Sequence, residues 1–370
     1  MNIVIAGGYI TQFGELWHKS LHALMTEAVE GALKSAAVDP KQVDAVIVAN
    51  MAATQFEGQA HLGALASELF SHFPPAVRVE AACASGGVAL LQAELGLLSG
   101  QYQTVVVVGV EKMTDKAAEV TEILSSAANI DTEYGSTFPG LYALLARAHM
   151  QQFGTTREAL STVASKNHQH AMGNKKAQFR KTISVAAVEK SPLVADPLHM
   201  LDCSPVSDGA AAVVLTTKMH SSKVRVVGFG QGQDSLDLAG RKSFTELQAT
   251  KTAAKQAFAR AGLAPAAIPL AEVHDCFTIA ELFAIEDLGF FTKGDAGRAT
   301  IAGETTFGGK IVINHSGGLK ACGHPVGATG IKQVAYLWEL LMQKQYQRGL
   351  AHNVGGSGAT AVVHILEQHS

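Results

Sequence analysis

Cysteine, charge and long apolar runs are all scarce in this sequence. Four cysteines among 370 residues make no disulfide framework, which favours a reducing, cytoplasmic compartment. Only 16% of the residues are charged and the net charge is −3, so the basic field that nucleic acid requires is missing and we expect no such partner. Because no run of 18 apolar residues occurs, the sequence predicts no membrane span.

Neither end of the sequence carries a targeting signal that we recognise. The first ten residues, MNIVIAGGYI, lack the basic region that precedes the apolar core of a signal peptide. The last four, EQHS, are not a peroxisomal signal. Both observations agree with the expected cytoplasmic location.

Apolar residues and glycine are abundant. Hydrophobic residues make up 47% of the chain and 36 residues are glycine. A chain of this size can bury a large core, which favours two domains or two fused halves. Apolar strands predicted at 3–6, 43–48 and 104–110 alternate with helices predicted at 21–38 and 62–73. This alternation predicts an α/β fold with a buried parallel sheet.

Residues 115–197 interrupt the alternation with a polar stretch, in which we expect short helices separated by Gly and Pro breaks. Between 157 and 190, seven basic residues stand against two acidic ones. The basic residues are Arg157, Lys166, Lys175, Lys176, Arg180, Lys181 and Lys190. Two interpretations stay open: a solvated surface, or a lid that meets an anionic ligand such as a nucleotide phosphate.

The second half of the chain repeats the first. Residues 32–49 can be laid on 257–274 without a gap, so that helix, break, Pro and strand coincide. Cys83-x-x-Gly86 matches His324-x-x-Gly327 in the same way, and a third match pairs 104–110 with 359–366. The period is far longer than that of a solenoid. The repeat therefore predicts a duplicated α/β domain about a pseudo-two-fold axis, with Cys83 and His324 facing each other at two helix starts.

Cys83 lies in a turn of small residues between a strand at 77–79 and a helical pattern that stops at Gly100. A thiol at a helix N-terminus tends to a lowered pKa, and the thiolate is the nucleophile. With His324 as its base, Cys83 would form a nucleophilic pair. A buried, inert cysteine is the alternative interpretation.

A second group of reactive side chains follows the strand predicted at 270–273. His274 offers an oxyanion donor and Cys276 a second thiol, at a strand end where sites form in parallel sheets. No CxxC or HxxxH spacing accompanies them, so we predict no metal. The glycine-rich loop at 352–358 can aim backbone N–H groups at a developing oxyanion. The remaining cysteines, Cys203 and Cys322, are interpreted as packing residues.

Taken together, these motifs resemble those of the thiolase superfamily. They are EAACASGG at 80–87, SDGAAAVVL at 207–215, HDCF at 274–277, GGLKACGHPVGATG at 317–330 and HNVGGSGA at 352–359. The resemblance spans essentially the whole chain and is closest to the HDCF subclass, of the sterol-carrier-protein and archaeal acetoacetyl-CoA type. Better-known thiolases have Asn-Glu-Ala-Phe in place of HDCF, and a late Cys-x-Gly that this chain lacks.

The resemblance implies a duplicated, five-layered αβαβα fold with an inserted loop domain that covers coenzyme A. On this basis, residues 1–116 and 199–218 would form the N-terminal half, 117–198 the lid, and 219–370 the C-terminal half. Two lid residues, Lys175 and Lys176, are predicted to meet the phosphates of coenzyme A.

It also implies roles for the reactive side chains. Cys83 would carry the acyl group as a thioester, and His324 would activate it and help bind the thioester oxygen of the second substrate. His274 would complete that oxyanion hole. Cys276 would replace the missing late cysteine as the acid and base at the α-carbon, with His352 or a water as the alternative.

The other oxyanion hole would consist of the N–H of Cys83 and that of Gly355 or Gly356. The expected reaction is reversible Claisen condensation or thiolytic cleavage of β-ketoacyl-CoA. Coenzyme A and acyl-CoA would be substrates, with no permanently bound cofactor.

The resemblance further implies a homodimer or a dimer of dimers, with a small bridging protein or a condensing synthase as a possible partner. Two other functions stay open. One is a condensing acyltransferase of the ketoacyl-synthase or polyketide type, and the other is a non-catalytic acyl-CoA-binding subunit.

Overall fold

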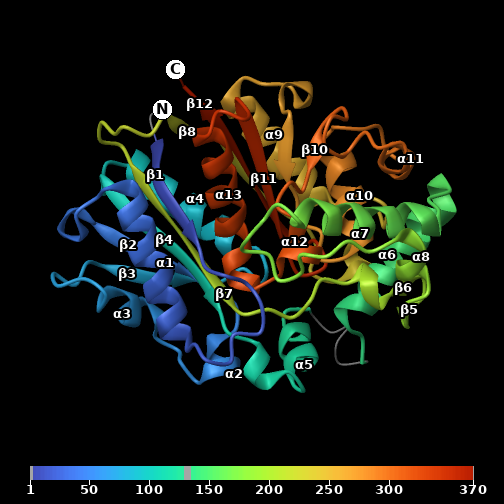
Figure 1. Ribbon diagram of the computed structural model, residues 1–370, viewed down its shortest axis with the longest axis horizontal. Coiled ribbons are helices and arrows are strands. Elements are labelled where there is room, and N and C mark those ends of the chain that lie inside the picture. Colours follow the sequence, from blue (N-terminus) through green and yellow to red (C-terminus); the bar gives the residue numbers. More distant parts are fainter. Residues whose placement is uncertain (1–2, 129–134, 370) are drawn as a thin grey trace.

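The computed structural model describes residues 3–128 and 135–369. It is built on a ten-stranded sheet in the order β10-β9-β11-β12-β8-β1-β7-β4-β2-β3 (Figure 1). The strands of the N-terminal half are β1 (Ile3–Ile10), β2 (Ala45–Ala49), β3 (Ala76–Val79), β4 (Thr104–Glu111) and β7 (Gly209–Thr216). Those of the C-terminal half are β8 (Val224–Gln233), β9 (Leu270–Glu272), β10 (Val312–Ile313), β11 (Arg348–Gly355) and β12 (Thr360–Gln368). A separate two-stranded sheet consists of β5 (Leu193–Ala195) and β6 (Leu198–His199).

Helices cover both faces of the large sheet. Those of the N-terminal half are α1 (Leu21–Ala36), α2 (Ala53–Glu57), α3 (Leu62–Ser67) and α4 (Ser85–Leu98). Between β4 and β7 come α5 (Val120–Ser125), α6 (Phe138–Phe153), α7 (Arg157–Ala171) and α8 (Val185–Glu189). The C-terminal half adds α9 (Gln248–Ala261), α10 (Thr278–Asp287), α11 (Ala296–Ile301), α12 (Gly318–Cys322) and α13 (Thr329–Met342). The predicted α/β class is confirmed.

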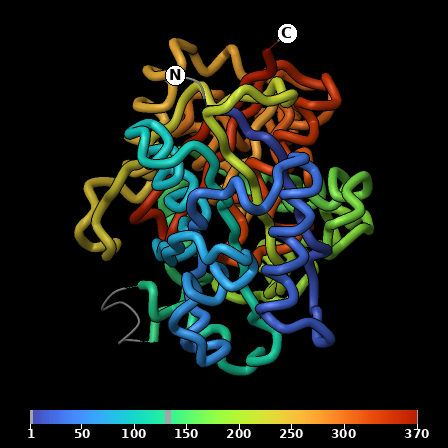
Figure 2. The backbone as a smooth tube through the Cα atoms, turned by 90° about the vertical axis from the view of Figure 1, so that its left-hand side faces the viewer, coloured from blue at the N-terminus to red at the C-terminus, as the bar shows by residue number. Residues whose placement is uncertain are grey.

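The sheet order reads symmetrically from the centre outwards, as the repeat predicts. In each half, the strand next to the edge (β2 or β9) is parallel to both of its neighbours, and the remaining pairs are antiparallel. The halves join where β1 meets β8. The view from the N-terminal half shows its blue segments in front and the C-terminal ones behind and above (Figure 2). The sheet therefore consists of two copies of one five-stranded unit.

One of the three predicted matches is wrong. By position in the sheet, β4 corresponds to β11, and β12 corresponds to β7. The sequence pairs 104–110 with 359–366 because both runs are apolar and β-branched, a composition that every buried strand of such a sheet shares. Strand direction separates them, since β4 runs parallel to β2 whereas β12 has only antiparallel neighbours.

Helices α4 and α13 form the central layer. Both contact strands of the two halves, whereas α1 packs mainly on β1, β7 and β4 of the N-terminal half and α9 mainly on β8 and β12 of the C-terminal half. The two halves of the sheet therefore pack on either side of α4 and α13. The layers are outer helices, half-sheet, central helices, half-sheet and outer helices, which are the five layers of the expected fold. The helix predicted at 62–73 is shorter than expected, because α3 ends at Ser67 and the chain then turns through Phe73, whose φ is +51°.

The inserted stretch contains longer helices than the short ones predicted. Helices α6 and α7 have 16 and 15 residues, and α7 packs against α10, α11 and α12. Two of the seven basic residues are engaged in ion pairs: Lys166 lies 2.7 Å from Glu281, and Arg157 lies 2.6 Å from Asp202. Part of the basic bias therefore stabilises the fold. The predicted domain boundaries stay a prediction.

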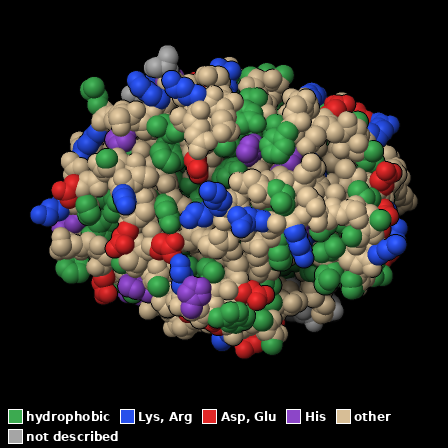
Figure 3. Space-filling view, viewed as in Figure 1, with side chains coloured by type: hydrophobic (Ala, Val, Ile, Leu, Met, Phe, Trp, Pro, Cys, Tyr) green, Lys and Arg blue, Asp and Glu red, His purple; other side chains and the backbone are tan. Residues whose placement is uncertain are grey.

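Across the described residues, no helix is both long and apolar enough to cross a membrane. Basic and acidic side chains are interspersed on the face seen in Figure 3.

Candidate active site

A strained turn presents Cys83 at the start of α4. The preceding residue, Ala82, has a φ of +50°, a conformation that is uncommon for residues other than glycine. Ser85 holds the turn closed, because its hydroxyl accepts from the N–H of Ala81 at 2.9 Å and donates to the C=O of Ala82 at 2.6 Å. The strained residue, Ala82, therefore directly precedes Cys83, and its backbone conformation sets the direction in which the chain presents the thiol.

Glycines allow the starts of α4 and α13 to touch. A Cβ added at Gly86 would lie 2.8 Å from the backbone nitrogen of Gly330, closer than real Cβ contacts come. The two helix starts, related by the pseudo-two-fold axis, therefore approach at backbone distance. Cys83 precedes one of them and His324 the other, so the repeat brings the two side chains to one place.

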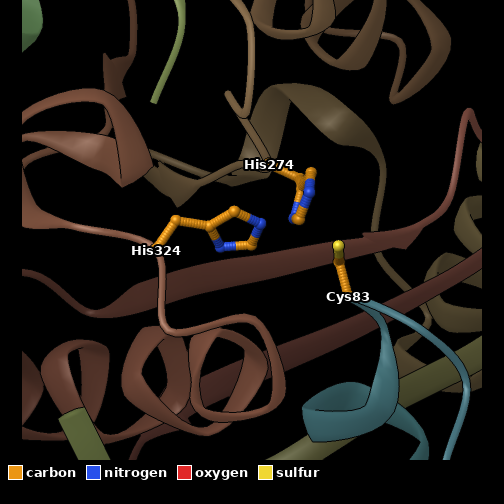
Figure 4. Close-up of side chains that lie close together, drawn as sticks. All are labelled: Cys83, His274 and His324. Carbon is orange, nitrogen blue, oxygen red and sulfur yellow. The ribbon is translucent and has the colours of Figure 1, made fainter. Parts of the chain in front are cut away.

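Cys83, His274 and His324 converge in the close-up of Figure 4. The sulfur of Cys83 and one ring nitrogen of each histidine lie within 4.8 Å of one another. The centroids of the two imidazole rings are 5.1 Å apart, and the rings are nearly perpendicular. Each imidazole has a buried Nε2 without a hydrogen-bond partner among the described residues. Two unpartnered ring nitrogens beside a thiol are free to act on a substrate.

The hydrogen bonds of His324 indicate its tautomer. Its Nδ1 lies 2.7 Å from the hydroxyl of Thr329, and that hydroxyl donates to the C=O of Pro325 at 3.2 Å. A hydroxyl has one proton, so Thr329 accepts from Nδ1–H of His324. The Nε2 of His324 then has a free lone pair, and it is able to take the proton of Cys83.

Gly356 is the glycine whose N–H reaches the sulfur. Its backbone N–H hydrogen-bonds Cys83, and its C=O accepts from the hydroxyl of Tyr142 at 3.2 Å. Gly355 instead packs against the turn, where an added Cβ would lie 2.5 Å from the C=O of Ala81. Of the two glycines predicted, Gly356 is therefore the one placed to form an oxyanion hole with the N–H of Cys83.

The thiol of Cys276 joins the same cavity. This cavity has a volume of about 200 Å³ and is lined by Cys83, Cys276, His324 and Gly356. The rest of its wall is mostly apolar: Met113, Val120, Leu124, Phe138, Pro139, Tyr142, Pro205, Val206, Phe277 and Val326. Cys203 also lines it, and its interpretation as a packing residue stays a prediction. Cys322 is buried and accepts from Asn174, as expected of a packing residue.

Burial reverses the predicted pKa shift of Cys83. Its pKa rises from 9.0 to about 12. Desolvation is the largest cause, and the charge of Glu111 adds to it, whereas the hydrogen bond from the N–H of Gly356 has the opposite effect. The prediction of a lowered pKa was wrong because the helix start lies in the interior, where a thiolate loses its hydration. The pKa of His324 is lowered to about 3, by burial and then by Lys332. The resting pair is therefore a neutral thiol and a neutral imidazole.

Alkylation should reveal the raised pKa of Cys83. Only the thiolate reacts, and a pKa of about 12 leaves a thiolate fraction at pH 8 that is about 10³-fold below that of an ordinary thiol. We expect the rate of Cys83 carboxamidomethylation, followed by mass spectrometry, to keep rising beyond pH 10. Glutathione, as the control, should level off near its own pKa. A plateau for Cys83 below pH 8 would instead indicate a resting thiolate–imidazolium pair.

Burial also raises the pKa of Cys276 well above 9.0, and the neighbouring Cys83 raises it further. Cys276 therefore rests as a thiol, the form that can donate a proton. The pKa of His274 is lowered well below 6.5 by burial, and then by His324 and His352. Both imidazoles at the site are neutral near pH 7.

The structure does not bring Lys175 and Lys176 to this cavity. They line a different pocket beside Tyr9, His315 and α13, and the two pockets share no lining residue. The side chain of Lys176 lies over the ring of Tyr9 at 4.7 Å. The sequence analysis assigned these two lysines to the site because residues 157–190 are rich in basic residues. The course of the inserted segment through the fold could not be read from that composition.

His352 points away from the cavity. Its Nε2 lies 2.9 Å from the hydroxyl of Thr250 on α9, and burial lowers its pKa to about 3. The next residue, Asn353, points the other way and lies between Cys83 and His274. The sequence analysis named the glycine-rich loop but passed over Asn353, although alternation along a strand could have identified it.

Cys83, His274 and His324 are also residue types that bind soft metal ions, and neutral imidazoles are the form that does so. The expectation of no metal stays a prediction.

Comparisons with known proteins bear on the family of the whole chain. The family model described as thiolase, N-terminal domain, matches residues 3–219, and that described as thiolase C-terminal domain-like matches 230–368. A relative from Methanothermobacter thermautotrophicus, named acetyl-CoA acetyltransferase, is 44% identical, and the match covers 99% of this chain and 100% of the relative.

Two solved structures share the fold. The Ltp2-ChsH2(DUF35) aldolase has a TM-score of 0.85 at 23% identity, over 99% of this chain and 98% of that one. A thiolase from Ascaris suum in complex with coenzyme A has a TM-score of 0.76 at 17% identity, over 100% of both chains. At these identities the likeness concerns the fold alone. The family models and the full-length relative decide the assignment: the chain belongs to the thiolase family.

Proposed function

We propose that this protein is a thiolase, which cleaves and forms the carbon–carbon bond of β-ketoacyl-CoA through an acyl group carried on Cys83. One observation carries the proposal: two thiols, those of Cys83 and Cys276, and the imidazole of His324 line one mostly apolar cavity, and a nitrogen of His274 lies within 4.8 Å of the Cys83 sulfur. Claisen chemistry needs an acyl carrier, an acid and base at the α-carbon, and two oxyanion holes. The residues around this cavity supply each of them.

Cleavage begins at Cys83. His324 takes the thiol proton on its Nε2, and the sulfur attacks the β-carbonyl carbon of the substrate. The oxyanion that forms accepts from the N–H groups of Cys83 and Gly356. Base catalysis during attack suits a thiol whose pKa is about 12, because no free thiolate has to accumulate first.

Breaking the bond between the α- and β-carbons leaves an acyl group on Cys83 and an enolate of the departing acyl-CoA. The Nε2 of His274 faces the enolate oxygen, and the thiol of Cys276 donates its proton to the α-carbon. The Cys276 thiolate recovers a proton from the protonated His324. The raised pKa of Cys276 supports this role, because it keeps the proton on the sulfur until the carbanion forms.

Coenzyme A then enters and releases the acyl group. His324 takes the proton of its thiol, the coenzyme A sulfur attacks the thioester, and the carbon–sulfur bond to Cys83 breaks. Cys83 recovers its proton from His324, so the enzyme returns to its starting state. Condensation follows the same steps in reverse.

Coenzyme A enters this scheme as a substrate, which the complex of the Ascaris suum thiolase supports. We also propose a homodimer or dimer of dimers. Strand β3 supports it, because it is an edge strand of the large sheet and Val77 on it is 54% exposed. A small bridging partner is supported by the two-protein name of the aldolase structure. The four free cysteines support a cytoplasmic location.

A thiolysis assay tests the proposed function. The protein is mixed with coenzyme A and β-ketoacyl-CoA substrates of increasing chain length, and the loss of substrate and formation of two acyl-CoA products are measured. We expect one acyl-CoA to be shorter than the substrate by two carbons and the other to be acetyl-CoA. Absence of cleavage with every length, together with no acylation of Cys83 by acyl-CoA, would refute the proposal and favour a binding subunit.

A further inference from the structure

Asn353 lies at the centre of the site, on β11, and its side-chain amide has only one possible orientation. Its Oδ1 accepts from the backbone N–H of Gly87 at 3.0 Å, and its Nδ2 donates to the backbone C=O of Cys83 at 2.9 Å. A backbone N–H can only donate and a backbone C=O can only accept, so exchanging the oxygen and nitrogen of the amide would break both bonds. The turn of Cys83 and the first turn of α4 therefore fix the amide.

The second hydrogen of this amide points at His274. The Nδ2 of Asn353 lies 3.3 Å from the Nδ1 of His274, and Nδ2 has no lone pair to offer. The Nδ1 of His274 must then accept, which it can do only without a proton. Burial lowers the pKa of His274 well below 6.5, so the ring is neutral and its single proton is on Nε2.

We propose that Asn353 is a positioning residue that holds His274 as the Nε2–H tautomer, so that this nitrogen donates to the enolate oxygen. The inference rests on the proposed function, because it gives His274 a donor role in that reaction. Thr329 holds His324 in the opposite tautomer, with the lone pair on Nε2. The two neighbouring, neutral imidazoles thus differ in tautomer because they have different hydrogen-bond partners. His274 donates to the substrate, and His324 accepts the proton of Cys83.

The tautomer can be measured without any variant. Long-range ¹H–¹⁵N spectra of ¹⁵N-histidine-labelled protein distinguish the protonated from the unprotonated nitrogen of a neutral ring, and the loss of signals in His274→Ala assigns them. We expect the proton of His274 on Nε2 and that of His324 on Nδ1. A proton on Nδ1 of His274 in the unchanged protein would overturn the inference, even where thiolysis is normal.

Asn353→Asp tests the consequence for catalysis. The carboxylate keeps the shape and the bond from Gly87, but it cannot donate to the C=O of Cys83 or to His274. Because it accepts from His274 instead, the proton of a neutral His274 moves to Nδ1. Loss of one oxyanion donor typically costs about 10²–10³-fold in turnover. We expect this loss at alkaline pH and partial recovery on acidification, when a cationic His274 again carries Nε2–H.

We attribute this pH dependence to His274 and the carboxylate introduced at position 353. The titratable groups that face His274 from neighbouring elements are uncharged near neutral pH. Burial lowers the pKa of His324 and of His352 to about 3 and raises that of Cys83 to about 12. Acylation of Cys83 by acyl-CoA is measured on the same variant, because the lost bond to the C=O of Cys83 can also slow that half-reaction. We expect acylation, which does not use His274 as a donor, to lack the recovery on acidification that turnover shows.

A double-variant cycle separates positioning from a structural role. If Asn353 acts through His274, then Asn353→Asp adds no further loss of turnover in a His274→Ala background. Losses that multiply, or a loss that is the same at every pH, would overturn the inference. Thiolysis missing in the unchanged protein, with the expected tautomer present, would refute the proposed function and leave the positioning intact.

Discussion

Replacing Cys83 with alanine is expected to abolish the acyl-enzyme and reduce thiolysis on the order of 10⁶-fold, the size of loss seen when a hydrolase nucleophile is removed. Cys83 is the thiol that lies beside both His324 and the N–H of Gly356. Cys83→Ser should lose nearly as much, because a serine hydroxyl in the same interior is harder still to deprotonate. The measurement is mass spectrometry of the quenched protein after incubation with acyl-CoA, together with steady-state turnover.

Cys322→Ala is the matched control for Cys83→Ala. It removes a buried thiol of the same kind that does not line the cavity, and we expect acylation and turnover close to those of the unchanged protein. A thioester found on Cys276 or Cys203, or turnover retained in Cys83→Ala, would show that another residue carries the acyl group.

The second large effect is expected for Cys276→Ala. A general acid or base contributes about 10²–10⁴-fold, and Cys276 is needed only where a proton moves at the α-carbon. We therefore expect turnover in thiolysis and condensation to fall by that factor, while acyl-CoA still acylates Cys83 at a near-normal rate. Single-turnover acylation and steady-state turnover, measured on the same preparation, separate the two half-reactions.

His352→Ala is the informative companion to Cys276→Ala. Because His352 bonds to Thr250 and points away from the cavity, we expect its removal to affect stability more than turnover. Normal turnover in Cys276→Ala with a large loss in His352→Ala would reverse the assignment of the acid and base. Acylation blocked in Cys276→Ala as severely as in Cys83→Ala would show that the two thiols do not divide the work.

The sequence by itself was enough to predict the α/β architecture and to select four of the residues that the structure brings together. Strand and helix periods depend on local residue patterns, and a repeat offset of 225 residues is visible without coordinates. Cys83 and His324 could be paired in advance because a pseudo-two-fold axis brings equivalent turns together. His274 and Cys276 follow a strand end, which in a parallel sheet is where sites form.

Only the tertiary structure decided the chemistry of those residues. The direction of the Cys83 pKa shift depends on how much water remains around the sulfur and on Glu111, both set by distant segments. His352 and Asn353 are adjacent on one strand and point to opposite faces, so the register of β11 against its neighbours determines which of them meets His274.

The same limit applies to charge and to strand equivalence. Lys175 and Lys176 were grouped with the site by composition, but the path of the insertion places them in another pocket. The equivalence of β4 with β11 depends on strand direction, which a run of apolar residues does not encode. Local patterns fix which elements form, whereas burial, side-chain facing and hydrogen-bond partners arise from residues far apart in the chain, and these properties set the protonation state of each group at the site.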